Sequence, residues 1–237
     1  MLYSDKILLY LDILNFKSKI RSTINQDGTD NEVEIQKIQK ALTEIRTQLN
    51  IGIADDTTSR KIVQFSDLII VSFNTNEAGG IFKIIADIHF LIRLLLIKHE
   101  ILCRGAIASG RLFHDEKFIF GPAFVNAYAS ESKAAVYPRV IMDKSIIRIS
   151  KEFNDNHLSS PEYELVSLST LISKDEDEMF FIDYIQKGIN ATEIIGFTDQ
   201  DYIIKLNYLI SKGLESNSPD ILIKYQWMNS KSQRINT

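Results

Sequence analysis

Residues 6–16, KILLYLDILNF, form an apolar run that is long enough to cross a buried sheet and that carries one carboxylate, Asp12, near its end. A second run, residues 63–73, VQFSDLIIVSF, has Asp67 as its single charged residue. A buried carboxylate is costly unless a positive group meets it. We therefore expect two strands that deliver both acids to one region, where they would form an all-oxygen cation site of the kind that Mg²⁺ and Mn²⁺ prefer.

Size and composition predict one compact domain. The chain has 237 residues, of which 45% are hydrophobic and only four are prolines. This length and this hydrophobic content are enough for one good-sized core. We expect that core over about residues 6–185 and a helical extension over about residues 199–237. The 27 basic and 31 acidic residues are interspersed, which argues against a nucleic-acid or membrane-surface protein. The single cysteine, Cys103, and the lack of a signal-peptide pattern favour a cytoplasmic protein.

Hydrophobic spacing predicts the order of strands and helices. Residues 32–49 carry apolar side chains at three- and four-residue spacing, as in an amphipathic helix. Residues 61–65 and 68–73 fit two strands joined by a tight turn. The remaining expected elements are strands at 101–110, 139–142 and 179–185, a hairpin within 112–120, and helices at 16–25, about 80–100, 122–135, 143–153, 199–215 and 219–227. This order favours an α+β fold with an antiparallel-rich sheet covered by helices on one face.

Two segments of the last third are expected to be irregular. Residues 154–161 are typical of a loop. The acidic run at residues 175–178, DEDE, is interpreted as a solvated turn.

The strand and turn that carry the two acids resemble the metal-binding segments of the class III nucleotidyl cyclases, the adenylate and guanylate cyclase family. Asp12-Ile13 followed by Phe16 is similar to that family's first metal aspartate, with its Asp-x-x-x-Phe pattern. The turn at residues 65–67, FSD, lies where the family has its Gly-Asp hairpin and second metal aspartate.

A later segment extends the resemblance. Residues 104–110, RGAIASG, are similar to the family's Arg-x-Gly-Ile-x-x-Gly strand, and residues 121–123, GPA, with Glu131 are similar to the Gly-x-x-Val-Asn helix that follows it. The likeness spans roughly residues 6–142. It implies a cyclase catalytic domain with a ferredoxin-like, antiparallel-rich sheet covered by helices.

A narrower resemblance covers nearly the whole chain. The phrases CRGAIASG, FIFGPAFVNAY, AVYPRV, MFFIDYI and KYQW resemble the stand-alone pyrimidine nucleotide cyclases of the bacterial Pycsar antiphage systems. This resemblance implies a homodimer that makes cyclic UMP or, as the second choice, cyclic CMP during phage infection. A separate effector protein would read the product.

The resemblance also implies which residues do the chemistry. Two divalent ions, Mn²⁺ or Mg²⁺, would be held about 4 Å apart by Asp12, the Ile13 carbonyl and Asp67. They would assist attack of the ribose 3′-hydroxyl on the α-phosphorus of UTP or CTP. Arg104 would add positive charge, and the expected composite sites at a head-to-tail dimer interface would take helix residues from the second subunit.

Five further positions are candidates for contact with the substrate. Pro122 is expected at the first position of the helix that follows Gly121, and the free N–H groups of the next turn could bind an anion. Gln64 and Ser66 are possible readers of the base by position alone. Phe16 and Asn126 belong to the family motifs described above.

The sequence departs from the adenylate cyclase pattern at the helix that follows Gly121. The family's transition-state asparagine and arginine fall on Val125 and Ala129 or, after a shift of one residue, on Asn126 and Ser130. The arginine is missing in both alignments. Arg104 is therefore either its substitute or an ordinary ion-paired residue at a strand end.

The base-reading lysine of adenylate cyclases is missing as well. It falls on Val63, and its loss fits a base other than a purine. Two rival functions stay open. A diguanylate cyclase or polymerase palm also pairs two aspartates, although its turn differs from the one at residues 65–67, and a cyclase-like nucleotide sensor without activity would explain the missing arginine.

Overall fold

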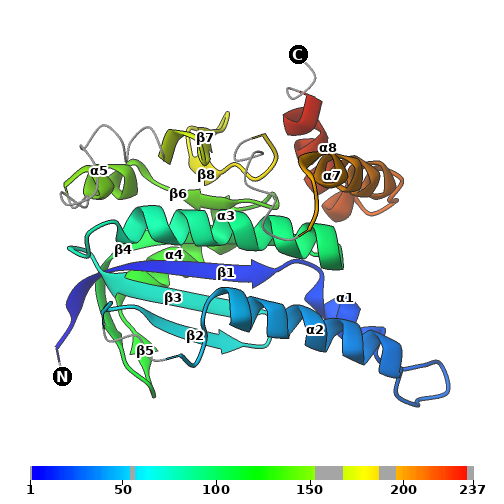
Figure 1. Cartoon of the computed structure of the whole chain (residues 1–237), viewed down its shortest axis with the longest axis horizontal. Helices are drawn as coiled ribbons and strands as arrows, with labels where there is room; N and C mark the ends of the chain where they lie inside the picture. The colour runs from blue at the N-terminus through cyan, green and yellow to red at the C-terminus, as the bar shows by residue number, and fades with distance from the viewer. Residues whose placement is uncertain (1, 54–56, 153–167, 187–195, 234–237) are drawn as a thin grey trace.

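The computed structural model describes residues 2–53, 57–152, 168–186 and 196–233 (Figure 1). An eight-stranded sheet forms its centre. Its strands are β1 (Ser4–Ile13), β2 (Lys61–Phe65), β3 (Leu68–Asn74), β4 (Cys103–His114), β5 (Ile119–Phe120), β6 (Val140–Met142), β7 (Ile172–Lys174) and β8 (Phe180–Ile182). The helices are α1 (Phe16–Arg21), α2 (Glu32–Gln48), α3 (Gly80–His99), α4 (Pro122–Ala134), α5 (Lys144–Glu152), α7 (Asp199–Leu214) and α8 (Pro219–Ser232).

The strand order is β2-β3-β1-β4-β6-β8-β7, and β5 pairs with β4 outside this path. β4 and β6 run parallel, whereas the other pairs are antiparallel. The segment from β1 to β4 has the β-α-β-β-α-β order of a ferredoxin-like unit, with β1 between β3 and β4. The expected α+β fold with an antiparallel-rich sheet is therefore confirmed.

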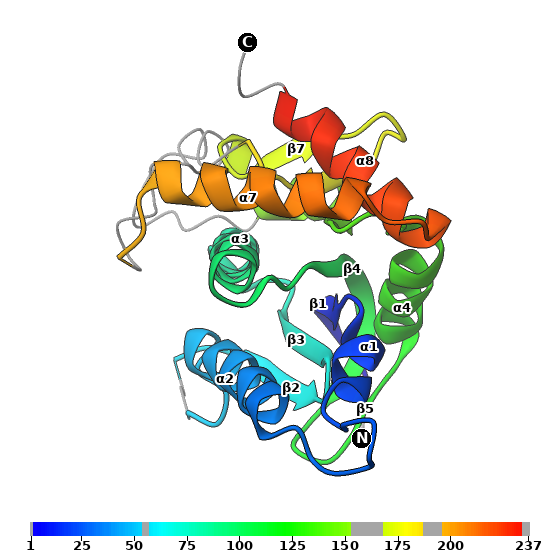
Figure 2. The same ribbon diagram turned by 90° about the vertical axis from the view of Figure 1, so that its right-hand side faces the viewer.

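β1 is buried on both faces, which explains why its sequence is a continuous apolar run. Ile7, Leu9 and Leu11 point into the main core, which α2 and α3 cover. Leu8 points the opposite way, into a smaller core beneath α4. Figure 2 shows the sheet between α2 and α3 on one side and α4 on the other. The expectation of helices on one face is thus wrong, because the two-sided apolar pattern of β1 requires cover on both faces.

α4 begins at a sharp change of direction that the sequence encodes. Gly121 has φ 143°, and a Cβ there would lie 2.7 Å from the carbonyl oxygen of Arg111, so the position requires glycine. Pro122 follows at the first helical position. Ala123, Ala127 and Glu131 then recur every four residues on the buried side of α4. The two small alanines let α4 lie close to the sheet, which brings Glu131 against the end of β1.

The expected hairpin at β2–β3 and the expected helices are present with small shifts of their ends. β4 continues through Gly110 to His114, where the sequence predicts an end at residue 110, and its last residues pair with β5 in the expected hairpin. β7 was not expected, and α8 ends at Ser232 rather than near residue 227. The expected loop at 154–161 lies outside the described residues.

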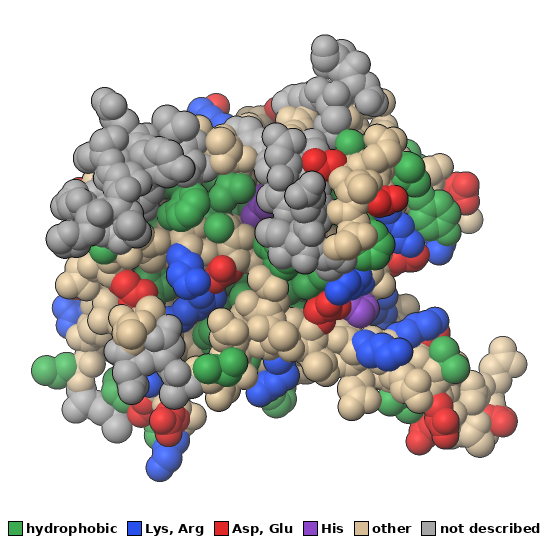
Figure 3. All heavy atoms as spheres, viewed as in Figure 1, with side chains coloured by type: hydrophobic (Ala, Val, Ile, Leu, Met, Phe, Trp, Pro, Cys, Tyr) green, Lys and Arg blue, Asp and Glu red, His purple; other side chains and the backbone are tan. Residues whose placement is uncertain are grey.

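The surface agrees with the interspersed charges of the sequence. On the face that carries α2, basic and acidic side chains lie next to one another (Figure 3). Among the described residues no helix combines the length and the apolar composition that crossing a membrane requires.

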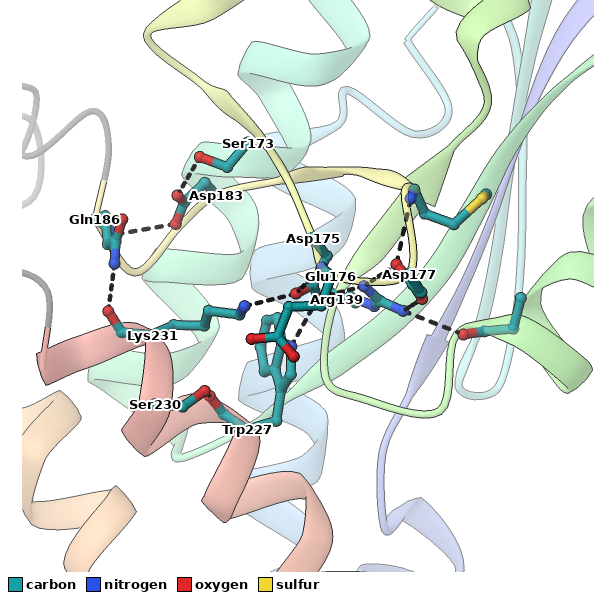
Figure 4. Close-up of polar contacts among 12 residues, drawn as sticks. Arg139, Ser173, Asp175, Glu176, Asp177, Asp183, Gln186, Trp227, Ser230 and Lys231 are labelled. Atoms are coloured by element: carbon teal, nitrogen blue, oxygen red, sulfur yellow. Dashed lines mark hydrogen bonds and ion pairs between the residues drawn. The ribbon is translucent and has the colours of Figure 1, made fainter.

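The acidic run at 175–178 forms a turn, but the prediction that the whole run is solvated is wrong. Asp175 is 8% exposed and accepts hydrogen bonds from Nε1 of Trp227 at 2.8 Å and from Nζ of Lys231 at 2.5 Å. It also pairs with the guanidinium of Arg139, which bonds Asp177 as well (Figure 4). Its partners are Arg139, just before β6, and Trp227 and Lys231 on α8. All three are distant in the sequence, so the composition of the run by itself predicts a solvated turn.

Loss of the Asp175 carboxylate should undock α8. An Asp175→Ala variant leaves the buried Arg139 and Lys231 without their shared anion, so unfolding free energy should fall by about 3 kcal/mol or more. Burial raises the pKa of Asp175, but hydrogen bonds from Lys231 and Trp227 outweigh it and hold the pKa below the ordinary value. The contribution is therefore present above about pH 4 and is lost as the pH falls further.

The measurement is urea unfolding followed by the fluorescence of Trp227, the sole tryptophan. The control is Glu176→Ala, which changes a neighbouring acid in the same turn. A loss of stability no larger than that of the control would contradict the role of Asp175.

Candidate active site

The two acids singled out by the sequence meet at one edge of the sheet. Asp12 lies near the end of β1, in register with Leu68 at the start of β3. Asp67 precedes Leu68 in the tight β2–β3 turn, where Ser66 has φ 58°. The backbone N–H of Ile13 donates a hydrogen bond to the carbonyl oxygen of Asp67 at 3.2 Å. The backbone of the turn is thus tied to the end of β1, and this tie fixes where both carboxylates project.

Arg104 lies directly across from Asp12 on the other side of β1. Its Nε is 3.5 Å from Oδ2 of Asp12 and 2.5 Å from Oε1 of Glu131 on α4. Glu131 is only 3% exposed, whereas Asp12 and Arg104 are partly exposed. The guanidinium therefore bridges a carboxylate at the rim of the site and one buried behind it.

Glu131 is the site residue that the sequence reasoning left without a role. It entered only as part of a family motif. The signal that could have found it is its spacing of four and eight residues from Ala127 and Ala123, which places it on the sheet-facing side of a helix. A buried acid on that side needs a cation, and Arg104 is the one that the fold provides.

Negative charge exceeds positive charge around Asp12. Burial raises the pKa of Asp12 to about 6, and the nearby charges of Glu131 and Asp67 also raise it, while Arg104 lowers it. The neighbouring Tyr10 responds in the same way, because burial and the charges of Glu131 and Asp12 raise its pKa to about 12. Such an excess of acid is the condition under which a divalent cation binds with a gain in free energy.

The donor set fits a divalent ion only in part. Among the described residues no three acidic, histidine or cysteine side chains converge closely enough to hold an ion unaided. Asp12, Asp67 and the Ile13 carbonyl offer three oxygen donors. Mg²⁺ is commonly held by one or two carboxylates together with substrate phosphates and water. The edge therefore fits a metal that arrives with a phosphorylated ligand.

The other predicted positions on this side of the molecule differ in their exposure. Ser66 is exposed at the tip of the β2–β3 turn, and Gln64 is half-buried on β2. Phe16 is 7% exposed and packs in the main core at the start of α1. Its ring leaves little surface for a ligand.

Gly121 lies at the opposite end of α4 from the acids, and Asn126 lies between the two, five residues before Glu131. Glu131 is nine residues beyond Pro122, which at 1.5 Å per residue separates them by roughly 14 Å. Asn126 is exposed and lines a cavity of about 290 Å³ between α4, β4 and β6, together with Ala129 and Ser130. Within one chain, α4 therefore does not bring its N-terminus to the edge that carries Asp12.

No protein-family profile matches the chain, and no curated protein matches it. In structure, 58 solved chains resemble it. The guanylyl cyclase domain of the RhoGC fusion protein of the aquatic fungus Blastocladiella emersonii is 13% identical, with 77% of this chain and 96% of that chain covered and a TM-score of 0.48.

Two further solved structures have similar scores. The catalytic core of a rhodopsin-guanylyl cyclase with converted specificity, in complex with ATPαS, is 13% identical at a TM-score of 0.44, with 77% and 97% of the chains covered. A class III adenylyl cyclase-like ATP-binding protein from Pseudomonas aeruginosa is 10% identical at a TM-score of 0.43, with 91% of this chain and 44% of that chain covered. Likeness at this level concerns the arrangement of helices and strands alone.

The charge of Asp12 should destabilise the metal-free protein. Because the folded pKa of Asp12 is raised to about 6, the favourable contribution of its protonated form is present below pH 4 and is lost as the pH rises through 6. Asp12→Asn should therefore raise the unfolding free energy at pH 8 by about 1 kcal/mol, after allowance for solvent screening.

Urea unfolding in the presence of a chelator, at pH 4.5 and at pH 8, measures this effect. Asp5→Asn, at the exposed start of the same strand, is the control and should show no such gain. A wild type more stable than Asp12→Asn at pH 8 would refute the assigned cost of the charge.

Proposed function

We propose that the protein is a nucleotidyl cyclase that converts a pyrimidine nucleoside triphosphate, UTP in preference to CTP, to the 3′,5′-cyclic monophosphate and pyrophosphate. The observation that carries the proposal is the pair Asp12 and Asp67 at one sheet edge, beside an arginine that Glu131 holds in place. The class III cyclase resemblance of the sequence supports it independently.

The residues of this edge divide the work by charge. Asp12, Asp67 and the Ile13 carbonyl would hold two divalent ions, Mn²⁺ or Mg²⁺. When bound, such ions lower the pKa of the attacking 3′-hydroxyl and stabilise the departing pyrophosphate. Arg104 can turn a guanidinium N–H toward a phosphate oxygen while its Nε stays with Glu131, which makes it the candidate for the missing transition-state arginine.

A homodimer is part of the proposal. Several large apolar side chains are exposed on α4, on the β4–β5 hairpin and in the β2–β3 turn: Phe65, Phe118, Phe120, Val125 and Tyr128. A second copy of the chain would cover them. It would also bring the N-terminal half of its own α4, with Gly121 and Asn126, to the acids that the first copy's α4 N-terminus does not reach.

The choice of base and the biological role rest on the sequence alone. Val63 replaces the purine-reading lysine, so we propose a pyrimidine, with Gln64 and Ser66 as its readers. The Pycsar resemblance favours synthesis of a second messenger in the cytoplasm during phage infection, with a separate effector that reads cyclic UMP.

A nucleotide sensor without activity is the second candidate. The absence of an arginine from α4 at Ala129 and at Ser130 favours it. Release of pyrophosphate in the presence of manganese distinguishes the enzyme from the sensor.

Loss of either acid should abolish turnover. The purified protein, incubated with the four ribonucleoside triphosphates and Mn²⁺, should yield a cyclic pyrimidine monophosphate identified by mass. Asp12→Ala and Asp67→Ala should each lower the rate by about 100-fold or more, because each removes a carboxylate from the ions. Asp5→Ala, on the same strand, is the control. Turnover retained in Asp12→Ala or in Asp67→Ala would contradict the proposed two-metal site.

Composite sites predict complementation between inactive subunits. Asp67→Ala and Asn126→Ala homodimers should each be weak, whereas half of the dimers in an equal mixture are mixed and contain one intact site. The mixture should therefore regain about a quarter of wild-type activity. Val125→Glu, which places a charge on the exposed side of α4, should give a monomer by light scattering. Failure of the mixture to exceed its parents would indicate that the sites are not shared.

A further inference from the structure

α8 is held against the body of the protein by a specific set of contacts. Figure 4 shows Trp227 and Lys231 of α8 directed at Asp175. The indole also stacks on Tyr137, with ring centroids 5.5 Å apart and planes 7° apart. Two side chains one turn apart are thus fixed to the same acid. These contacts set both the position of α8 and its rotation about its own axis.

That rotation determines where Lys224 points. Lys224, Trp227, Met228 and Lys231 are spaced as i, i+3, i+4 and i+7, so they share one side of the helix. The last three are buried. Lys224, which is partly buried, therefore lies on the side of α8 that faces the protein body, one turn nearer the start of the helix. Figure 2 shows that this part of α8 lies next to the end of α4, the helix that carries Glu131.

The groups around Lys224 belong to the candidate active site. Burial lowers the pKa of Lys224, the charge of Arg104 lowers it further, and the charges of Asp220 and Asp12 raise it. Asp220 lies one turn earlier on α8, while Asp12 and Arg104 come from β1 and β4. Among the described residues no ion pair joins Lys224 to a carboxylate, in contrast to Lys231, which pairs with Asp175.

Charge at this edge shows what Lys224 is suited to bind. A nucleoside triphosphate brings about four negative charges, which two divalent ions would match. The acids Asp12, Asp67 and Glu131 then exceed Arg104 by roughly two charges. Arg104 is already engaged by two of these acids. Lys224 is a second cation near Arg104, and the charge of Arg104 disfavours its ammonium form. A phosphate group between the two side chains would stabilise both positive charges.

We propose that Lys224 binds the phosphate oxygens of the triphosphate at the Asp12–Asp67 edge, so that the C-terminal α7–α8 hairpin is part of the active site. This inference rests on the proposed function in that it names the residue that completes its phosphate site. The ammonium of lysine is a compact point charge on a flexible stem, which suits a phosphate tail that changes position as pyrophosphate leaves.

The test separates binding from catalysis by using inorganic tripolyphosphate with Mn²⁺ as the probe in calorimetry. Lys224→Ala should weaken binding about tenfold, equal to 1.4 kcal/mol, and Lys224→Arg should restore most of it. Lys224→Ala should also raise KM for the nucleotide by about tenfold. The matched control is Lys212→Ala, which removes a mostly exposed lysine from α7. Unchanged Trp227 emission would show that α8 remains docked in each variant.

Each outcome decides one of the two proposals. If Lys224→Ala binds tripolyphosphate within twofold of Lys212→Ala, the role of Lys224 is refuted, whatever the wild type does with nucleotides. If the wild type forms no cyclic nucleotide but Lys224→Ala still weakens tripolyphosphate binding, the phosphate site stands and the cyclase proposal fails. Wild-type protein that does not bind tripolyphosphate at all overturns the inference about Lys224.

Discussion

A charged carboxylate at the end of a doubly buried strand is the constraint on which the rest of this structure depends. β1 is enclosed by β3 and β4 within the sheet and by helices on both faces, so its backbone and its apolar side chains are shielded from water. Asp12 interrupts that run at the point where the strand reaches the edge of the core. Its charge must be met there, and the fold meets it with Arg104 from the adjacent strand.

The compensation is incomplete. Arg104 also neutralises the buried Glu131, so the edge keeps a surplus of acid that is visible in the raised pKa values of Asp12 and Tyr10. A protein selected for stability alone would replace one of these acids with an apolar residue of similar size. Their retention beside one another is consistent with a site that gains its missing positive charge from a ligand.

Local patterns in the sequence predicted most of the framework. The β2–β3 hairpin, the amphipathic α2 and the glycine-proline start of α4 depend on neighbours within a few residues, so their spacing is enough to identify them. β7 was not predicted because three residues are too few to show the alternation of apolar and polar side chains that marks a strand. The cover on both faces of the sheet also escaped, although the alternation of Ile7 and Leu8 between two cores is its direct cause.

Long-range charge pairs could not be predicted in this way. Asp175 reads as solvated in the sequence because its partners lie 36 residues before it, at Arg139, and 56 residues after it, at Lys231. Glu131 reads as one more polar residue of a helix until the sheet places Arg104 opposite it. In both cases the sequence showed the acid but not its pairing with a cation, because the two residues are far apart in the chain.

The presence or absence of an ion pair also distinguishes two polar side chains on α4 and two on α8. On α4, Glu131 is engaged at the acid edge of its own chain, while Asn126 stays exposed on a surface rich in apolar side chains. On α8, Lys231 pairs with Asp175, whereas Lys224 forms no ion pair with a carboxylate among the described residues. Each helix thus has one charged side chain that is ion-paired within the chain, Glu131 on α4 and Lys231 on α8, and one polar side chain that is not, Asn126 on α4 and Lys224 on α8. Under the proposed function, Lys224 would meet the phosphates at the acid edge of its own chain, and Asn126 would reach the acid edge of a second copy. A nucleotide bound between two copies would satisfy both, and this would tie assembly of the dimer to completion of its sites.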